Sequence, residues 1–311
     1  MKITGIRIGF IVIGILIYVS GQAQTNQKLY LNMIDAEDIG PRTQRFLINN
    51  HVDNLLYFDA RYIDPKKTRQ VDVATLRNAI RNQIPDSLAT GIAVLDWEGD
   101  IYDDLSYQLK PQSDEYNAAL NAFIKAIKVA KALRPNIKWG FYGLPFTGRH
   151  KPNPEANERW IQSNNNLKPL LKQCDLLLPS LYIHGYEPGG NEGFIKFNMQ
   201  QFLILGDNLN KPVIPYLWHR YYPRQLSDKS MKAIPVNEFT TFIKTVLSVS
   251  YNNKKAAGII WWSADNYYYH SMKVPALLNE TSPQNYKSYH DSLMLNYSTE
   301  ILKTIKQLNT K

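Results

Sequence analysis

Short apolar runs alternate with amphipathic segments along most of the chain. Seven of these runs are rich in β-forming residues and have the length of buried strands. They are residues 28–34, 54–60, 91–98, 137–145, 175–183, 212–222 and 256–264. The segments between them predict helices at 71–84, 113–134, 157–173, 193–205 and 236–250. A last amphipathic helix carries Met294, Tyr297, Ile301, Ile305 and Leu308 on one face.

This alternation predicts βα units and a parallel sheet. The near-continuous apolar character of the strands agrees, because parallel strands are covered on both faces. About seven units predict an α/β fold, a (β/α) barrel of the triosephosphate-isomerase type that is distorted by its strand number. An open doubly wound sheet is the alternative, and the lack of a Gly-rich phosphate loop after the first strand weighs against it. No linker interrupts residues 28–311, which predicts a single domain.

The N-terminal residues have the plan of a secretory signal. Lys2 and Arg7 come first, an apolar run covers 9–19, and small residues follow near Ala23. The run is shorter than the roughly 20 residues of a membrane-spanning helix. We therefore expect a cleaved signal peptide at 1–23, no membrane span after its removal, and a secreted or periplasmic protein. An uncleaved N-terminal anchor is the alternative.

The charge of the chain narrows the choice of partner. Lys and Arg number 36 against 27 Asp and Glu, a net charge of +9, which favours a nucleic acid, a membrane surface or an anionic polysaccharide. Zinc-finger spacing, an RNP-like motif and dense basic runs are all missing from the sequence, so nucleic acid is disfavoured. With a secretory signal, an anionic polysaccharide remains. The oligomeric state is not determined by the sequence.

The sequence indicates no metal site and no cofactor. Cys174 is the only cysteine, so intrachain disulfides are excluded, and we expect it to be a buried small hydrophobe. His150, His184 and His219 are not spaced as metal ligands, and we expect each at the surface or in a loop.

The most informative candidate chemistry follows the strand at 91–98. In a barrel, catalytic groups lie where strands run into their following loops. Asp96 and Glu98 point to one face because side chains alternate along a strand, and their Cα atoms are roughly 6.5 Å apart. Like charges so close cannot both ionise freely, which predicts a raised pKa, as in a glycosidase acid and its ionised partner. A hydrated pair at the start of a loop is the alternative.

Five blocks together resemble the hyaluronidases of glycoside hydrolase family 56. They are IPD with GIAVLDWE at 84–98, AKALRPNIKWGFYGLP at 130–145, LLPSLY at 177–182, PYLWHRY at 215–221 and AAGIIWW at 256–262. Their order and spacing are specific, although each block alone is modest. The resemblance covers about residues 83–265; the first two strands and the C-terminal helix match poorly.

The resemblance implies a retaining endo-β-N-acetylhexosaminidase in which the substrate's own 2-acetamido group is the nucleophile. It implies that Glu98 is the general acid and that Asp96 stabilises the acetamido group. It also assigns the sugar-binding residues Tyr142, Tyr182, Tyr221 and Trp262. A register slip would put Tyr216 or Tyr222 in the place of Tyr221. Trp261 and Trp262 point to opposite faces, so only one of them lines the site.

The chain also departs from the family. It has no disulfides, D-W-E continues as GDIYDD, and the 137–145 strand continues as PFTGRHKPNP. These loops help to shape a substrate groove, so a hyaluronan- or chondroitin-like polymer is only one option beside another 2-acetamido glycan. Several basic side chains are expected near strand ends, where they would either contact uronate carboxylates or be solvated loop charges. They are Arg149, His150, Lys151, Arg220 and Arg224. A non-catalytic glycan-binding barrel is the alternative function.

Overall fold

The computed structural model describes residues 26–34, 39–106, 113–148, 154–184, 190–223 and 228–310. The predicted signal segment, Arg149, His150, Lys151 and Arg224 lie outside these ranges. The described strands are β1 (Lys28–Met33), β2 (Asp53–Asn54), β3 (Leu56–Asp59), β4 (Gly91–Asp96), β5 (Ile137–Phe141), β6 (Tyr216–Trp218) and β7 (Gly258–Ser263).

Twelve helices occur in the part of the chain that the structure describes. The longer ones are α1 (Pro41–Asn49), α3 (Val73–Gln83), α5 (Asp114–Leu133), α6 (Pro154–Asn166), α8 (Gly190–Leu209), α9 (Val236–Ser248) and α12 (Tyr286–Asn309). Short helices fill the connections: α2 (Ala60–Ile63), α4 (Asp100–Asp104), α7 (Lys168–Leu171), α10 (Asp265–His270) and α11 (Pro275–Leu278). None of the described helices is long and apolar enough to cross a membrane.

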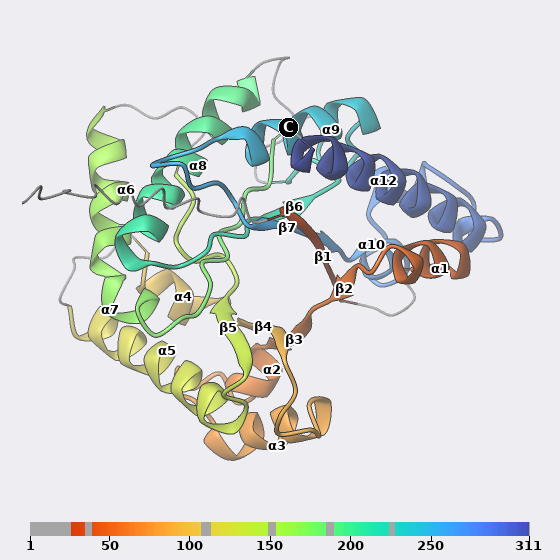
Figure 1. Cartoon of the computed structure of the whole chain (residues 1–311). Helices are drawn as coiled ribbons and strands as arrows, with labels where there is room; N and C mark the ends of the chain where they lie inside the picture. The colour runs from red at the N-terminus through yellow and green to blue at the C-terminus, as the bar shows by residue number, and fades with distance from the viewer. Residues whose placement is uncertain are drawn as a thin grey trace, which may run out of the picture.

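The strands form a closed parallel circuit. One sheet has the order β2-β1-β7-β6 and the other β3-β4-β5. At one seam β3 continues β2 after Leu55, whose N–H donates to the Leu31 carbonyl. At the other seam an extended segment, 177–180, makes single parallel bridges to Tyr142 on one side and to Val213 and Tyr216 on the other. The described residues therefore provide seven parallel positions in an α/β fold, an arrangement that agrees with the predicted distorted barrel (Figure 1).

Prolines explain why two predicted strands are shorter than expected. Pro179 lies in the 177–180 segment, and Pro212 and Pro215 precede β6. Proline has no N–H to donate to a ladder, so isolated bridges replace a continuous one in this part of the barrel.

Side-chain alternation divides the core into two layers. One buried cluster lies inside the barrel and includes Val94, Ile214, Tyr216 and Ile260. Their strand neighbours, such as Leu95 and Trp261, face outward into a larger cluster shared with the helices. Asp96 has the parity of Val94, so the alternation points it into the barrel.

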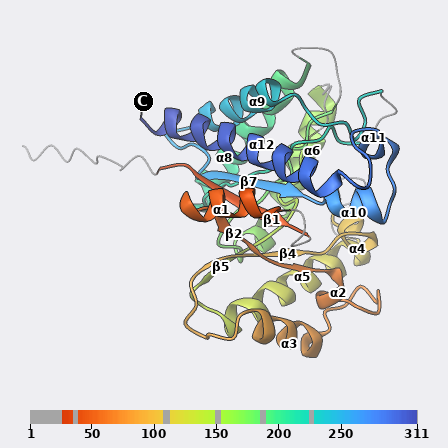
Figure 2. The same ribbon diagram turned by 90° about the vertical axis from the view of Figure 1, so that its right-hand side faces the viewer.

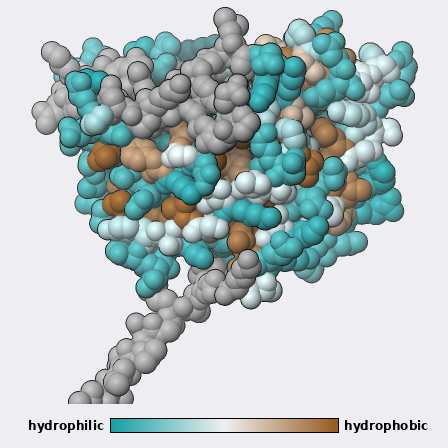
Figure 3. Space-filling view, turned by 90° about the horizontal axis from the view of Figure 1, so that it is seen from above, coloured by the Kyte–Doolittle hydropathy of each residue, from teal (hydrophilic) through white to brown (hydrophobic). Residues whose placement is uncertain are grey.

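Helices cover the outside of the barrel. The side chain of Ser113 caps α5 by accepting from the Tyr116 N–H, and α5 packs on α3 beside β5. On the opposite side α12 lies along α9 and α1 (Figures 1 and 2). Asp291 of α12 accepts from the N–H groups of Arg42 and Thr43, which caps α1. Seen from above, hydrophilic residues cover most of the described surface and hydrophobic ones are scattered among them (Figure 3).

Candidate active site

The carboxylate pair lies at the end of β4. Asp96 is 7% exposed, whereas Glu98, two residues further on, is exposed. Gly99 follows with φ of 92°, a backbone conformation that favours glycine, and there the chain turns from the strand into α4. The Tyr57 hydroxyl of β3 donates to Asp96 Oδ2, while the buried Asp96 Oδ1 has no hydrogen-bond partner among the described residues. The site thus combines a deep carboxyl group with a shallow one.

Burial sets the protonation of this pair. It raises the pKa of Asp96 to about 8, with a further contribution from the negative charge of Glu98, and the Tyr57 hydrogen bond opposes the rise. Partial burial and the nearby Asp103 raise the pKa of Glu98 as well. Since both groups resist ionisation and repel each other when ionised, the pair tends to keep one proton near neutral pH. That is the state required of a general acid with an ionised partner.

An aromatic wall stands beside the carboxylates. Tyr142 follows β5, Tyr182 follows the 177–180 segment, and Trp262 lies on β7. The Tyr182 ring centroid is 6.3 Å from that of Tyr142 and 5.7 Å from that of Trp262, with which it stacks at 27°. Trp261, by contrast, faces outward, is fully buried and donates its indole N–H to His219 Nδ1 at 3.1 Å. The structure therefore brings Asp96, Tyr142, Tyr182 and Trp262 to one end of the barrel, with Glu98 at its rim.

Tyr221 lies elsewhere. Its hydroxyl donates to Glu238 Oε2 of α9 at 2.7 Å, and its ring belongs to the core between barrel and helices. Tyr216 points inward instead, accepts a 2.7 Å hydrogen bond from Asn32 Nδ2, and has its pKa raised by burial and by the charge of Asp96. Tyr222 also joins the aromatic wall, 5.8 Å from the Tyr182 ring. In this Tyr-rich stretch Tyr216 and Tyr222 therefore point into the barrel and Tyr221 points away from it.

Sequence reasoning did not single out three residues of this region, Asn32, Tyr57 and Tyr268. Asn32 and Tyr57 come from the first two strands, which resemble the family poorly. Trp218 stacks on Tyr268 of α10 with ring centroids 5.6 Å apart. Burial, and then the charges of Tyr222 and Glu98, raise the pKa of Tyr268 to about 12, so it lies within electrostatic reach of the acid. A polar residue at an inward position of a strand was the available signal for Asn32 and Tyr57.

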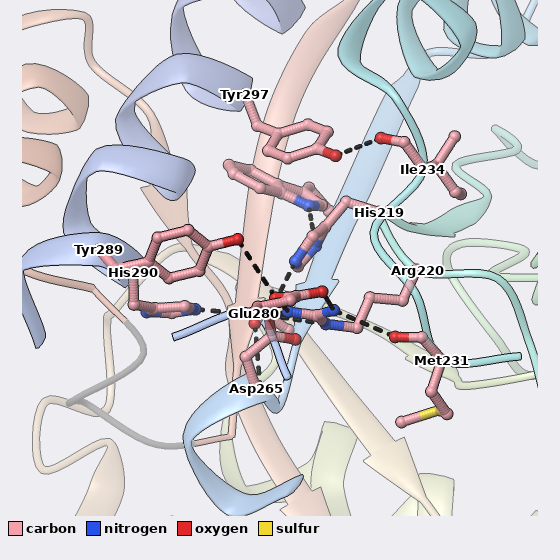
Figure 4. Close-up of polar contacts among 11 residues, drawn as sticks. His219, Arg220, Met231, Ile234, Asp265, Glu280, Tyr289, His290 and Tyr297 are labelled. Atoms are coloured by element: carbon pink, nitrogen blue, oxygen red, sulfur yellow. Dashed lines mark hydrogen bonds and ion pairs between the residues drawn. The ribbon is translucent and has the colours of Figure 1, made fainter. Parts of the chain in front are cut away.

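Two of the expected loop residues are buried instead. Arg220 is 1% exposed; it donates to Asp265 Oδ2 at 2.5 Å and to Glu280 Oε1 at 2.7 Å (Figure 4). His219 is fully buried and its Nε2 lies 3.1 Å from Asp265 Oδ2. The expectation of solvent-facing side chains was wrong for both, because the carboxylates that hold them lie far along the chain: Asp265 at the start of α10, and Glu280 just after α11. Arg149 lies outside the described residues.

The described residues include no group of three or more His, Cys, Asp or Glu side chains placed to hold a metal ion. Cys174 is buried, as expected, and burial raises the pKa of its thiol to about 12. It lies in the core shared with the helices and takes no part in the site.

Fold and site together define a (β/α)-barrel protein with paired carboxyl groups and an aromatic wall at the carboxyl ends of its strands. The sequence model of the hyaluronidase family matches residues 105–293, more than half of the chain. The chain belongs to the hyaluronidase family, glycoside hydrolase family 56. The match begins after Asp96 and Glu98.

Known relatives agree with this family. The chain is 25% identical over 188 residues to a hyaluronidase of Apis mellifera, covering 50% of this chain and 49% of that protein. It is 23% identical over 123 residues to inactive hyaluronidase B of Vespula vulgaris, covering 37% and 36%. The chain thus spans about half the length of these relatives or less.

Solved structures show the same fold. Bee venom hyaluronidase has a TM-score of 0.58 at 14% identity, over 85% of this chain and 99% of that one. Its complex with a hyaluronic acid tetramer has a TM-score of 0.58 at 16% identity, over 81% and 96%. The structural similarity supports a common fold, but at such low sequence identity it does not establish the chemistry.

Proposed function

We propose that this protein is a secreted glycoside hydrolase, an endo-β-N-acetylhexosaminidase that cleaves an anionic glycosaminoglycan of the hyaluronan or chondroitin type. The observation that carries the proposal is the pair of carboxyl groups of Asp96 and Glu98, both with a raised pKa, at the same end of the barrel as Trp262 and Tyr182. A related structure that holds a hyaluronic acid tetramer supports the choice of polymer. The apolar N-terminal segment supports secretion.

Glu98 acts as the general acid in this proposal. It is the exposed member of the pair, so it is the one that a glycosidic oxygen reaches. In the free protein burial raises the pKa of both groups, so the pair keeps a proton near neutral pH. A bound polymer removes water from around Glu98, which raises its pKa further and favours the proton there. Glu98 then protonates the leaving oxygen as the bond from C1 to that oxygen breaks.

Asp96 serves the second half of the step. Its ionised form accepts a hydrogen bond from the N–H of the substrate's acetamido group, whose carbonyl oxygen bonds to C1 as the leaving group departs. Tyr57 occupies only Oδ2; the buried Oδ1 has no partner among the described residues and can accept that bond once the sugar displaces its cover. Water then attacks C1 and gives its proton to Glu98. The bond from C1 to the acetamido oxygen breaks, which opens the five-membered ring that this oxygen had formed and leaves a product of retained configuration. Trp262 and Tyr142 supply the apolar walls of the sugar pocket.

The decisive experiment is reducing-end release from hyaluronan, chondroitin and a neutral 2-acetamido polymer. Glu98→Gln keeps the shape of the side chain but has no proton to give, so turnover should fall by about 10²–10⁴-fold with binding retained. Glu158→Gln, an exposed glutamate of α6, is the matched control and should keep full turnover. Unchanged turnover in Glu98→Gln would refute the assignment of the acid.

A non-catalytic glycan-binding barrel is the second candidate. The specific observation in its favour is the matched relative whose name marks it as inactive. In that case the folded protein binds the polymer and releases no reducing ends, and Glu98→Gln changes neither property. The same panel of substrates therefore separates the two functions.

A further inference from the structure

An open groove of about 420 Å³ runs along the outside of the barrel between α3 and α5. Its lining shares no residue with the carboxylate site. Arg77 of α3 stands on one wall, and Lys125 and Lys128 of α5 stand on the other. All three cations are exposed, and none has an ion pair with a residue that the structure describes. The floor is apolar and is made by Ile124, Val129 and Ala132.

The stability of the two helices does not explain these cations. Helix α3 contains no acidic residue, and those of α5, Asp114 and Glu115, are confined to its first turn. Lys125 and Lys128 are three residues apart on one face, where like charges repel and destabilise a helix. An amphipathic helix needs only a polar outer face, and uncharged polar side chains or a mixture of acidic and basic ones would supply it equally well. A row of one sign facing a groove instead focuses a positive potential there.

We propose that this groove is a second, non-catalytic binding site for a segment of acidic polysaccharide. Carboxylate or sulfate groups along such a chain pair with Arg77, Lys125 and Lys128. The apolar C–H faces of its sugar rings lie on Ile124 and Val129. The site goes beyond the proposed hydrolysis and depends on that proposal only for the identity of the polymer.

The composition of the groove favours this polymer over other polyanions. A single-stranded nucleic acid needs aromatic rings on which its bases stack, and the groove lining contains none. A membrane surface needs large apolar anchors such as Trp or Phe that enter the lipid, and the groove lining contains no aromatic residue. Sugar rings need only small apolar contacts between regularly spaced cations.

The test compares two variants of equal net charge for binding to immobilised hyaluronan and chondroitin sulfate. The groove variant combines Arg77→Gln, Lys125→Gln and Lys128→Gln. The control combines Lys172→Gln, Lys232→Gln and Lys255→Gln, three exposed lysines outside the groove. Both carry Glu98→Gln so that the polymer stays intact. We expect affinity at low salt to fall on the order of tenfold in the groove variant and to change little in the control, with the gap closing in high salt.

Equal affinities of the two variants for the acidic polymers would overturn the groove site. It would also be overturned if the groove variant lost as much affinity for a neutral 2-acetamido polymer as for the acidic ones. Arg77→Lys keeps the charge and should keep the affinity. Circular dichroism confirms that each variant is folded. Binding is measured without turnover, so failure of the groove and failure of the proposed hydrolysis are separate results. Without Glu98→Gln, the groove variant should cleave a short oligosaccharide as fast as the parent.

Discussion

Two buried aspartates at the same end of the barrel have opposite surroundings. Asp96 ends β4 and Asp265 begins α10 two residues after β7, and both are less than 10% exposed. Burial alone raises the pKa of either carboxyl group. For Asp265, the neighbouring Arg220 and His219 outweigh burial and hold the pKa well below its usual range. Among the described residues no cation lowers the pKa of Asp96; Tyr57 and the carboxyl groups of Glu98 and Asp59 lie near it, and its pKa rises to about 8.

The difference separates a structural charge from a reactive one. His290 of α12 also lies 3.5 Å from Asp265 Oδ2, and Arg220 donates further to Glu280 and to the Met231 carbonyl. This network therefore links the segment after β6 to α10, to the turn after α11 and to α12 (Figure 4). Such a carboxylate is ionised over the whole physiological range and has no proton to exchange. A carboxyl group buried without a counter-ion keeps a proton that it can give or share, which makes it a candidate for chemistry.

Removing the charge of Asp265 should have the largest effect on stability. Asp265→Asn leaves Arg220 buried with half of its counter-charge, which should cost about 3–5 kcal/mol in the free energy of unfolding at pH 7. Because the folded pKa is depressed, the stabilisation is present above the unfolded pKa and is lost as pH falls through the folded one. Urea unfolding at several pH values measures this. A loss below about 1 kcal/mol would show that the network is not structural.

The same substitution at Asp96 should act in the opposite direction. Asp96→Asn removes a group whose folded pKa is raised, so the wild-type protein loses stability as pH rises from about 4 to 8 and the variant does not. We expect similar stability at pH 4 and a variant that is more stable by about 2 kcal/mol at pH 9. Turnover should nevertheless fall sharply. A variant that is less stable than wild type at pH 9 would contradict the comparison.

The sequence predicts the first of these aspartates and not the second. Asp96 and Glu98 are neighbours in sequence, and the alternation of a single strand predicts that they share a face. The Asp265 network joins residues up to 71 positions apart, from His219 to His290, and no local pattern reveals that contact. For the same reason His219 and Arg220 looked like solvated loop residues.

The barrel itself is predictable because each βα unit carries its own periodicity. Alternation predicts that only one of Trp261 and Trp262 faces the interior, and the resemblance names Trp262, which is the one that does. It also agrees with the outward position of Tyr221, which has the parity of Leu217, so it was the resemblance and not the alternation that put Tyr221 in the site. Asn32 and Tyr57 stay unseen because a single polar residue in an apolar strand has many structural explanations.

The smallest effect should come from the hydrogen bond that modulates Asp96. The Tyr57 hydroxyl favours the ionised carboxylate and lowers its pKa, so Tyr57→Phe should move the bell-shaped pH dependence of turnover to higher pH by about one unit or less. The control is Tyr221→Phe, which removes a hydrogen bond to Glu238 away from the site. It should cost about 1 kcal/mol of stability and leave the pH profile in place. If both variants shift the profile equally, the shift reflects general loosening of the barrel; if only Tyr57→Phe does, the proton shared by Asp96 and Glu98 governs the reaction.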